Sequence, residues 1–230
     1  GTFTNTERCV QRVRKAVKAP GEAREDWRII CDVARRMGYD MDYADPSAIQ
    51  DEIAALTPIY GGILYDRIDE VGLQWPCPDT DHAGTKFLHA QTFSRGKGKF
   101  HPVEFLPPRE MPDEEYPFVL TTGRMLQHWH TGTMTRRSEV LHDLVPTGFV
   151  ELNPDDAVRM DVGEGEMLAV SSRRGRIEVP ALVTGKVAPG CVFLTFHFKE
   201  NPANALTIAA LDPIAKIPEF KACAVKVEKN

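Results

Sequence analysis

The sequence has no cysteine pattern that would hold a metal cluster or build a disulfide framework. Its five cysteines are scattered over 230 residues, at positions 9, 31, 77, 191 and 223. An odd and widely spaced set does not match the ligand spacing of zinc or iron–sulfur sites. We therefore interpret the cysteines as reduced thiols, which is typical of a cytoplasmic protein.

The chain also lacks long apolar runs and an excess of positive charge. Runs such as Cys191–Leu194 fall far short of the roughly 18 apolar residues of a membrane-spanning helix. Twenty-eight basic residues against thirty-three acidic ones give a net charge of −5, which disfavours a general attraction to nucleic acid. Walker-type, nucleophile-elbow and HExxH motifs are missing too. We therefore expect no membrane insertion and no nucleic-acid partner, and local basic clusters must carry any anion binding.

Residues 128–138 (HWHTGTMTRRS) form the most informative stretch, because they combine hydroxyl side chains and basic residues with no acidic residue. Gly132 allows the backbone to approach a ligand closely, and Arg136 and Arg137 supply positive charge. A helix beginning after Thr135 would point its free N–H groups at the same anion. The stretch indicates an anion-binding loop; the alternative is a surface loop that leads into an ordinary capped helix.

The first part of the chain shows helical patterns. Thr4 and Glu7 suggest a capping box for a basic helix that ends near Ala19. The apolar spacing from Trp27 to Met37 predicts a second, core-facing helix that stops at Gly38.

Two further features complete the first half. Asp45 and Pro46 predict the start of a short helix that ends near Leu56. Residues 57–116 have poor periodicity and many prolines, so we expect little regular structure there. Since the sequence opens on Gly1 with no targeting pattern, we also expect it to be a piece of a longer protein.

After Tyr116 the pattern changes to short strands. Asn153 and Pro154 predict the start of one short helix among them. The expected strands span residues 116–124, 149–152, 167–172, 177–183, 191–198 and 222–227. So many strands with few helices favour a closed β-barrel.

Several segments resemble the molybdopterin-dependent oxidoreductases. Residues 116–138 are similar to the start of the C-terminal domain of that family, in its formate dehydrogenase branch. Further similar segments follow in family order at residues 151–157, 171–175, 196–198, 201–207 and 218–221, and residues 1–7 resemble a segment ahead of that domain. The resemblance implies a mixed α+β fold, in which a helical and irregular segment (residues 1–115) belongs to preceding domains and residues 116–230 form a double-psi β-barrel.

The resemblance also implies a cofactor. In the family this barrel binds molybdopterin guanine dinucleotide, which carries molybdenum or tungsten. The positions that match the family's contact segments are Gly123, Arg124, His128, His130, Thr131, Thr133, Asn204, Phe220 and Lys221.

Three histidines allow other interpretations. His128 and His130 would share one face of an extended segment, a spacing compatible with zinc or copper, but no third ligand is in sight. We expect no metal ligand among them. His197 lies in an apolar strand and is predicted to be a core histidine with one satisfied hydrogen bond.

The hypothesis that follows is the cofactor-binding C-terminal portion of a formate dehydrogenase-like catalytic subunit. In the resembled enzymes formate is oxidised to CO2 at the metal, and the metal-ligating cysteine, the iron–sulfur cluster and NAD belong to the rest of the enzyme or to its iron–sulfur and flavin partner subunits. We therefore expect no catalytic residue here and no activity of this chain alone. One alternative is a separate, non-catalytic molybdopterin-binding accessory subunit, and another is an interaction barrel unrelated to pterins.

Overall fold

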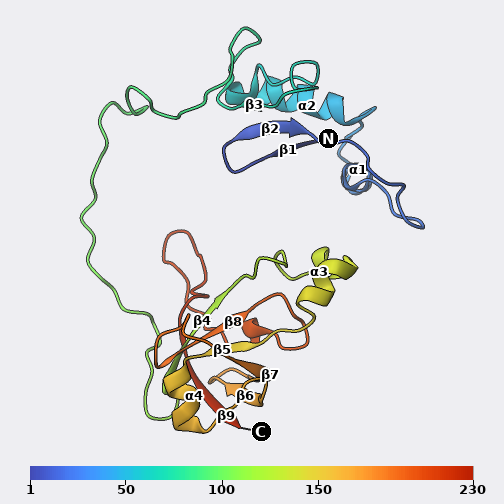
Figure 1. Cartoon of the computed structure of the whole chain (residues 1–230). Coiled ribbons are helices and arrows are strands. Elements are labelled where there is room, and N and C mark those ends of the chain that lie inside the picture. The colour runs from blue at the N-terminus through green and yellow to red at the C-terminus, as the bar shows by residue number, and fades with distance from the viewer. Residues whose placement is uncertain (230) are drawn as a thin grey trace. The chain divides into compact units, whose positions relative to one another are not determined.

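The computed structural model describes residues 1–229. The chain divides into two compact units, one over residues 1–101 and one that starts at Pro102. Figure 1 shows the short strands and helices of the first unit and the strands of the second. Among the described residues, none of the helices is long and apolar enough to cross a membrane.

The first unit begins with a small antiparallel sheet. Strand β1 (Thr2–Thr4) pairs with β2 (Cys9–Arg12), and β2 pairs with β3 (Leu73–Gln74). The predicted basic helix over residues 4–19 is therefore wrong. The physical reason is a turn in which the Asn5 side chain accepts hydrogen bonds from the backbone N–H groups of Glu7 and Cys9, which reverses the chain. Val10 is then buried by the sheet pairing.

Helix α1 (Asp26–Arg36) confirms the predicted second helix, and Gly38 follows it with φ at +86°. Its expected core-facing orientation is wrong within this unit, because Ile30 and the C-cap residue Met37 are 59% and 81% exposed. Only Cys31 of this helix is buried. The helical period thus predicted the element correctly, whereas its apolar face is uncovered within its own unit.

Helix α2 (Pro46–Leu56) confirms the third predicted helix. Its N-cap is Asp45, whose carboxylate accepts a hydrogen bond from the backbone N–H of Ser47. Beyond it, residues 57–116 contain only the short helix η1 (Pro58–Tyr60) and the two-residue strand β3, as their poor periodicity predicts. Ile63 and Ile68 from this region pack with Val10 and Cys77 in a small core.

The second unit contains a closed barrel of six strands, which confirms the expected double-psi architecture (Figure 1). The strands are β4 (Phe118–Gly123), β5 (Val150–Leu152), β6 (Met167–Ser171), β7 (Arg176–Val183), β8 (Cys191–Thr195) and β9 (Cys223–Lys229). Their order around the barrel is β4-β8-β5-β7-β6-β9. The β4–β8 and β5–β7 pairs are parallel and the other four pairs are antiparallel.

The barrel interior is filled by apolar side chains of alternating strand residues, such as Leu120, Val150 and Leu194, all at most 1% exposed. Helix α4 (Pro154–Met160) lies beside it and starts at the predicted N-cap Asn153, which accepts from Asp155 N–H at 2.9 Å. The short helices η2 (Thr135–Arg137), α3 (Glu139–Leu144) and η3 (Ala203–Ala205) lie in the loops between strands.

Residues 102–115 belong to the barrel unit in the structure, although the sequence placed them with the first segment. Glu110 attaches this stretch, because its carboxylate pairs with Arg173 and Arg174 and accepts from Ala224 N–H of β9 at 3.0 Å. The hydrogen bond from Arg174 has the largest effect, and together with the bonds from Ala224 N–H and Arg173 it lowers the pKa of Glu110 to about 2. The long sequence separation of the partners explains why the local pattern could not predict this attachment.

Candidate functional site

The end of strand β4 is the point where two of the predicted contact segments meet. The Thr122 hydroxyl donates to the backbone carbonyl of Phe220 at 2.7 Å, and the Lys221 ammonium donates to the carbonyl of Thr122. Gly123 is needed here, because a Cβ would lie 2.6 Å from the ring of Phe193. The structure therefore brings Gly123, Phe220 and Lys221 together.

Arg124 follows directly and carries an exposed guanidinium. Its guanidinium carbon lies 4.8 Å from the ring centre of Trp129 and 5.9 Å from that of Phe196, so cation–π contacts orient it. The same group approaches the ring of His130 at 3.4 Å. Within residues 1–229, neither Arg124 nor Lys221 forms an ion pair with a carboxylate. Arg124 and Lys221 are thus two cations at the carboxyl end of β4 that no carboxylate of the described residues neutralises.

The loop after Arg124 turns sharply at His130. This residue has φ at +47° and Gly132 has φ at +71°, and the N–H of Gly132 donates to the carbonyl of Trp129 at 2.9 Å. A Cβ on Gly132 would meet the Arg136 side chain at 2.7 Å, so the tight turn and the close packing both require glycine. His130 itself is exposed beside Arg124.

His128 lies differently from His130, although both were predicted as cofactor contacts. It is 3% exposed, and its Nε2 and Nδ1 atoms lie 2.8 Å from Val145 O and 3.2 Å from Thr135 Oγ1. Both ring nitrogens are thus engaged within the chain. Any part that His128 plays in ligand binding must run through the loop that it holds. Among the described residues, no group of three metal-ligating side chains forms around this pair.

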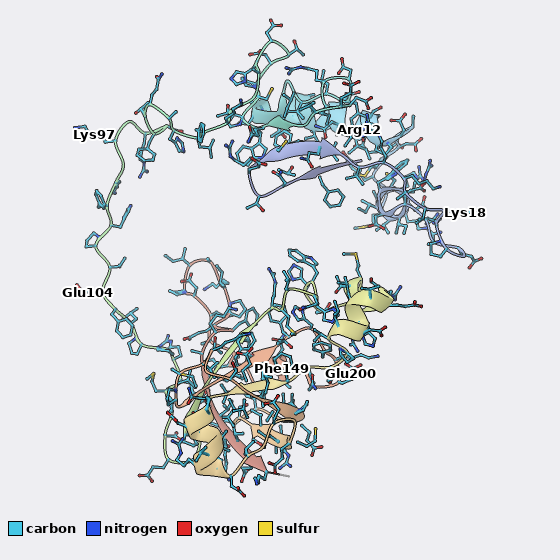
Figure 2. All side chains as sticks on the ribbon, in the orientation of Figure 1. Arg12, Lys18, Lys97, Glu104, Phe149 and Glu200 are labelled. Atoms are coloured by element: carbon cyan, nitrogen blue, oxygen red, sulfur yellow. The ribbon has the colours of Figure 1, made fainter. Side chains whose placement is uncertain are left out.

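Thr131 and Thr133 line a cavity of about 490 Å³ beside the turn, and their hydroxyls lie 3.0 Å apart. Three cationic side chains, Arg136, Arg137 and Lys199, line the same cavity. One carboxylate, that of Glu200 (labelled in Figure 2), pairs with Arg136 through both oxygens. The cavity therefore has an excess of positive charge.

Two buried polar atoms of this cavity have no partner within the described part of the chain, namely Nε of Arg136 and Nδ1 of His142. A buried donor without a partner is costly, so an anion that enters the cavity would gain contacts that the chain does not supply. The helix expected directly after Thr135 begins only at Glu139, so its N-terminus is not the anion site that the sequence suggested. Helix α3 has only six residues, starts after the 3₁₀ turn and carries Glu139 in its first turn.

Asn204 is exposed on the short helix η3, away from these contacts. Its carbonyl accepts from the Thr207 hydroxyl at 3.1 Å, and η3 lies against the β6–β7 turn. No described contact joins Asn204 to the cations at the end of β4. Most of the predicted positions thus lie either at the end of β4 or at the basic cavity, and His130 lies between these two groups. Asn204 belongs to neither group.

The sequence did not identify Lys199, Glu200 and His142 as parts of the cavity. Glu200 reaches Arg136 across 64 residues of chain, so no local pattern signals the pair. The useful signal was the neighbouring FHF segment at 196–198, which the resemblance had marked. The prediction for His197 was also incomplete, because both of its ring nitrogens are hydrogen-bonded.

The fold and site define a barrel that presents unpaired cations and a basic cavity on its loops. Residues 118–224 match the family model described as the Molydopterin dinucleotide binding domain, and residues 1–36 match the model described as Molybdopterin oxidoreductase. The chain belongs to the molybdopterin oxidoreductase family, as the sequence resemblance predicted.

Two curated relatives match essentially the whole chain. The F420-dependent formate dehydrogenase subunit alpha of Methanocaldococcus jannaschii is 49% identical over 100% of this chain and 35% of its own length. Formate dehydrogenase H of Escherichia coli is 36% identical over 99% of this chain and 33% of its own length. The chain thus spans about a third of the length of these relatives.

A solved structure shares the fold at low sequence identity. Acetylene hydratase from Pelobacter acetylenicus superposes with a TM-score of 0.70 over 100% of this chain and 36% of its own chain, at 16% identity. This likeness concerns the fold alone.

Proposed function

We propose that this chain is the C-terminal, cofactor-binding portion of a formate dehydrogenase catalytic subunit, and that its barrel holds molybdopterin guanine dinucleotide. The observation that carries the proposal is the pair of uncompensated cations, Arg124 and Lys221, at the end of β4. The formate substrate is inferred from the relatives, which are formate dehydrogenases by name.

The residues fit the group that the family implies. A dinucleotide presents a pyrophosphate, and charge-assisted hydrogen bonds from Arg and Lys are the usual contacts for phosphate oxygens. Arg124 and Lys221 would hold that charge, while Thr131 and Thr133 would supply hydroxyls beside the basic cavity. We propose that Gly123, His130, Asn204 and Phe220 line the remainder of the cofactor, and that His128 contributes by holding the loop.

When bound, the metal of the cofactor supplies the two-electron oxidation of formate to CO2. This chain's own residues bind and orient the dinucleotide in that process. The metal would be molybdenum or tungsten. Its cysteine ligand and the iron–sulfur cluster would belong to the other two thirds of a polypeptide as long as the relatives. Electrons would leave through partner subunits in the cytoplasm, and the name of the Methanocaldococcus jannaschii relative suggests F420, rather than NAD, as the acceptor to test first.

The alternative of a separate accessory subunit is less well supported. In both curated relatives, the matching segment is part of one longer polypeptide. We therefore favour a portion of the catalytic subunit over an independent binding protein.

The proposal can be tested by comparing two purified proteins, the 230-residue chain and the longer polypeptide that contains it. Each is assayed for molybdenum, tungsten and iron, and for formate-dependent dye reduction. We expect metal and turnover in the longer protein and none in the 230-residue chain. Formate turnover by the 230-residue chain above the level of a heat-denatured control would contradict the proposal, as would a longer protein that loads the cofactor and leaves formate untouched.

A further inference from the structure

His197 joins the two ends of the loop that carries the proposed cofactor contacts. It follows strand β8 and is 1% exposed. Its Nε2 lies 2.8 Å from the backbone N of Met125, and its Nδ1 is hydrogen-bonded to the carbonyl of His130. One imidazole therefore fixes the residue after Arg124 and the turn that precedes Thr131.

These partners determine the protonation of the ring. The N–H of Met125 can only donate, so Nε2 must present its lone pair, and the carbonyl of His130 can only accept, so Nδ1 must carry the hydrogen. The imidazole is therefore neutral, with its proton on Nδ1. A second proton on Nε2 would place two donors face to face and break the bond to Met125.

The neighbouring His128 presents its Nε2, rather than its Nδ1, to a backbone carbonyl. Its Nε2 donates to Val145 O, while its Nδ1 lies 3.2 Å from the Thr135 hydroxyl oxygen, which accepts from Trp129 N–H at 3.1 Å. The rings of His128 and His197 lie 5.8 Å apart. The two imidazoles thus contact the loop from Met125 to Thr135 at both of its ends.

The groups around His197 oppose its protonation. Burial is the largest cause that lowers the pKa of His197, and the titratable groups that face it, His128, Arg124 and His130, lower it further. The carbonyl of His130 acts in the other direction without reversing the shift. Because the folded pKa lies below the ordinary 6.5, the loop is stabilised above pH 6.5 and loses stability as the pH falls below that value.

We propose that His197 is the positioning residue of the cofactor loop, and that its protonation releases Met125, the residue next to Arg124, and thereby weakens retention of the bound dinucleotide. This inference rests on the proposed function. It predicts that cofactor retention by the enzyme depends on pH through a residue that does not itself touch the ligand.

The first test uses the 230-residue chain without cofactor. Nitrogen NMR of labelled histidine should show His197 with a protonated Nδ1 and an unprotonated Nε2 at pH 8; the opposite tautomer would overturn the proposal. Amide exchange at Met125, corrected for its intrinsic rate, should speed up by about tenfold per pH unit below 6.5, the slope of a single coupled proton. Exchange at Met125 that does not change between pH 8 and pH 5 would also overturn it.

The second test uses variants in the longer polypeptide. His197→Gln places an amide near the position of Nε2, and this amide does not titrate. The metal content of this variant should therefore be the same at pH 8 and pH 5. Wild type and the exposed control His101→Gln should lose metal on acidification. A pH-dependent loss in His197→Gln equal to that of wild type would overturn the positioning role. The proposed function has a separate test in Arg124→Ala. A full metal content in that variant at pH 8 would contradict the proposed function, whatever the pH dependence of His197→Gln, so the two failures are distinguishable.

Discussion

The two units of this chain differ in how much of their apolar surface they bury themselves. The barrel unit encloses a core of strand residues that includes Leu120, Leu152 and Leu194, all nearly inaccessible to solvent. The first unit has a core cluster of only four buried residues among those described, and its helix α1 leaves Ile30 and the C-cap residue Met37 exposed. A closed barrel can complete its own core, whereas the first unit leaves an apolar helix face uncovered within itself.

The largest expected effect lies in the barrel core. Leu194→Ala should destabilise the barrel by about 2–5 kcal/mol, because it leaves a cavity among residues that cannot collapse around it. The matched change Ile30→Ala in exposed α1 should cost no more than about 0.5 kcal/mol. Native-state amide exchange of the barrel strands and of helix α1 under increasing urea measures both. Equal costs at the two positions would contradict the difference between the units.

The next effect concerns the attachment of residues 102–115 to the barrel. Glu110→Gln should destabilise the barrel unit by about 1–3 kcal/mol, because charge-assisted bonds to Arg173 and Arg174 are lost. Glu228→Gln, in an exposed pair with Lys226, is the control and should change little.

The pH dependence of this effect follows from the lowered pKa of Glu110. Since its folded value is about 2, its contribution is complete above pH 4.5 and is lost as the pH falls from 4.5 towards 2. Urea denaturation between pH 7 and pH 2 should therefore show the wild type and Glu110→Gln converging at the acidic end. A constant difference between them over this range would argue against the attachment.

A smaller effect compares the N-caps of the two units. Asn153→Ala and Asp45→Ala should each cost about 1 kcal/mol, the usual loss of a capping hydrogen bond. The cost should be larger at Asn153, because its amide also donates to the carbonyl of Val187 at 2.7 Å. Exchange of the α2 and α4 amides reports each helix separately, and a larger loss in α2 would reverse the expected order.

The comparison also shows what a sequence can reveal. Both caps, helix α1 and the barrel strands were predicted, because each follows from a pattern within a few residues. The helix expected over residues 4–19 failed, since the Asn5 turn and the pairing of β2 with Leu73–Gln74 override a weak period of valines. The orientation of α1 could not be predicted either, because a period identifies an apolar face without identifying what covers it.

The candidate site depends on both the resemblance and the fold. The resemblance supplied Arg124 and Lys221, while their meeting at the end of β4 depends on contacts across nearly one hundred positions, which only the fold creates. Lys199, Glu200 and the double role of His197 escaped the sequence for the same reason. Local patterns therefore identified the chemistry of the loop, and the barrel determined which residues share it.

The most direct test of the central claim compares metal loading with stability in the longer polypeptide. Molybdenum and tungsten per folded protein are measured together with the thermal midpoint for wild type, Arg124→Ala, Lys221→Ala and the control Lys226→Ala on β9. Arg124→Ala and Lys221→Ala should each lose most of the metal, while the free energy of unfolding changes by no more than about 0.5 kcal/mol. Full metal loading in both variants, equal to that of Lys226→Ala, would contradict the claim that these two cations hold the dinucleotide.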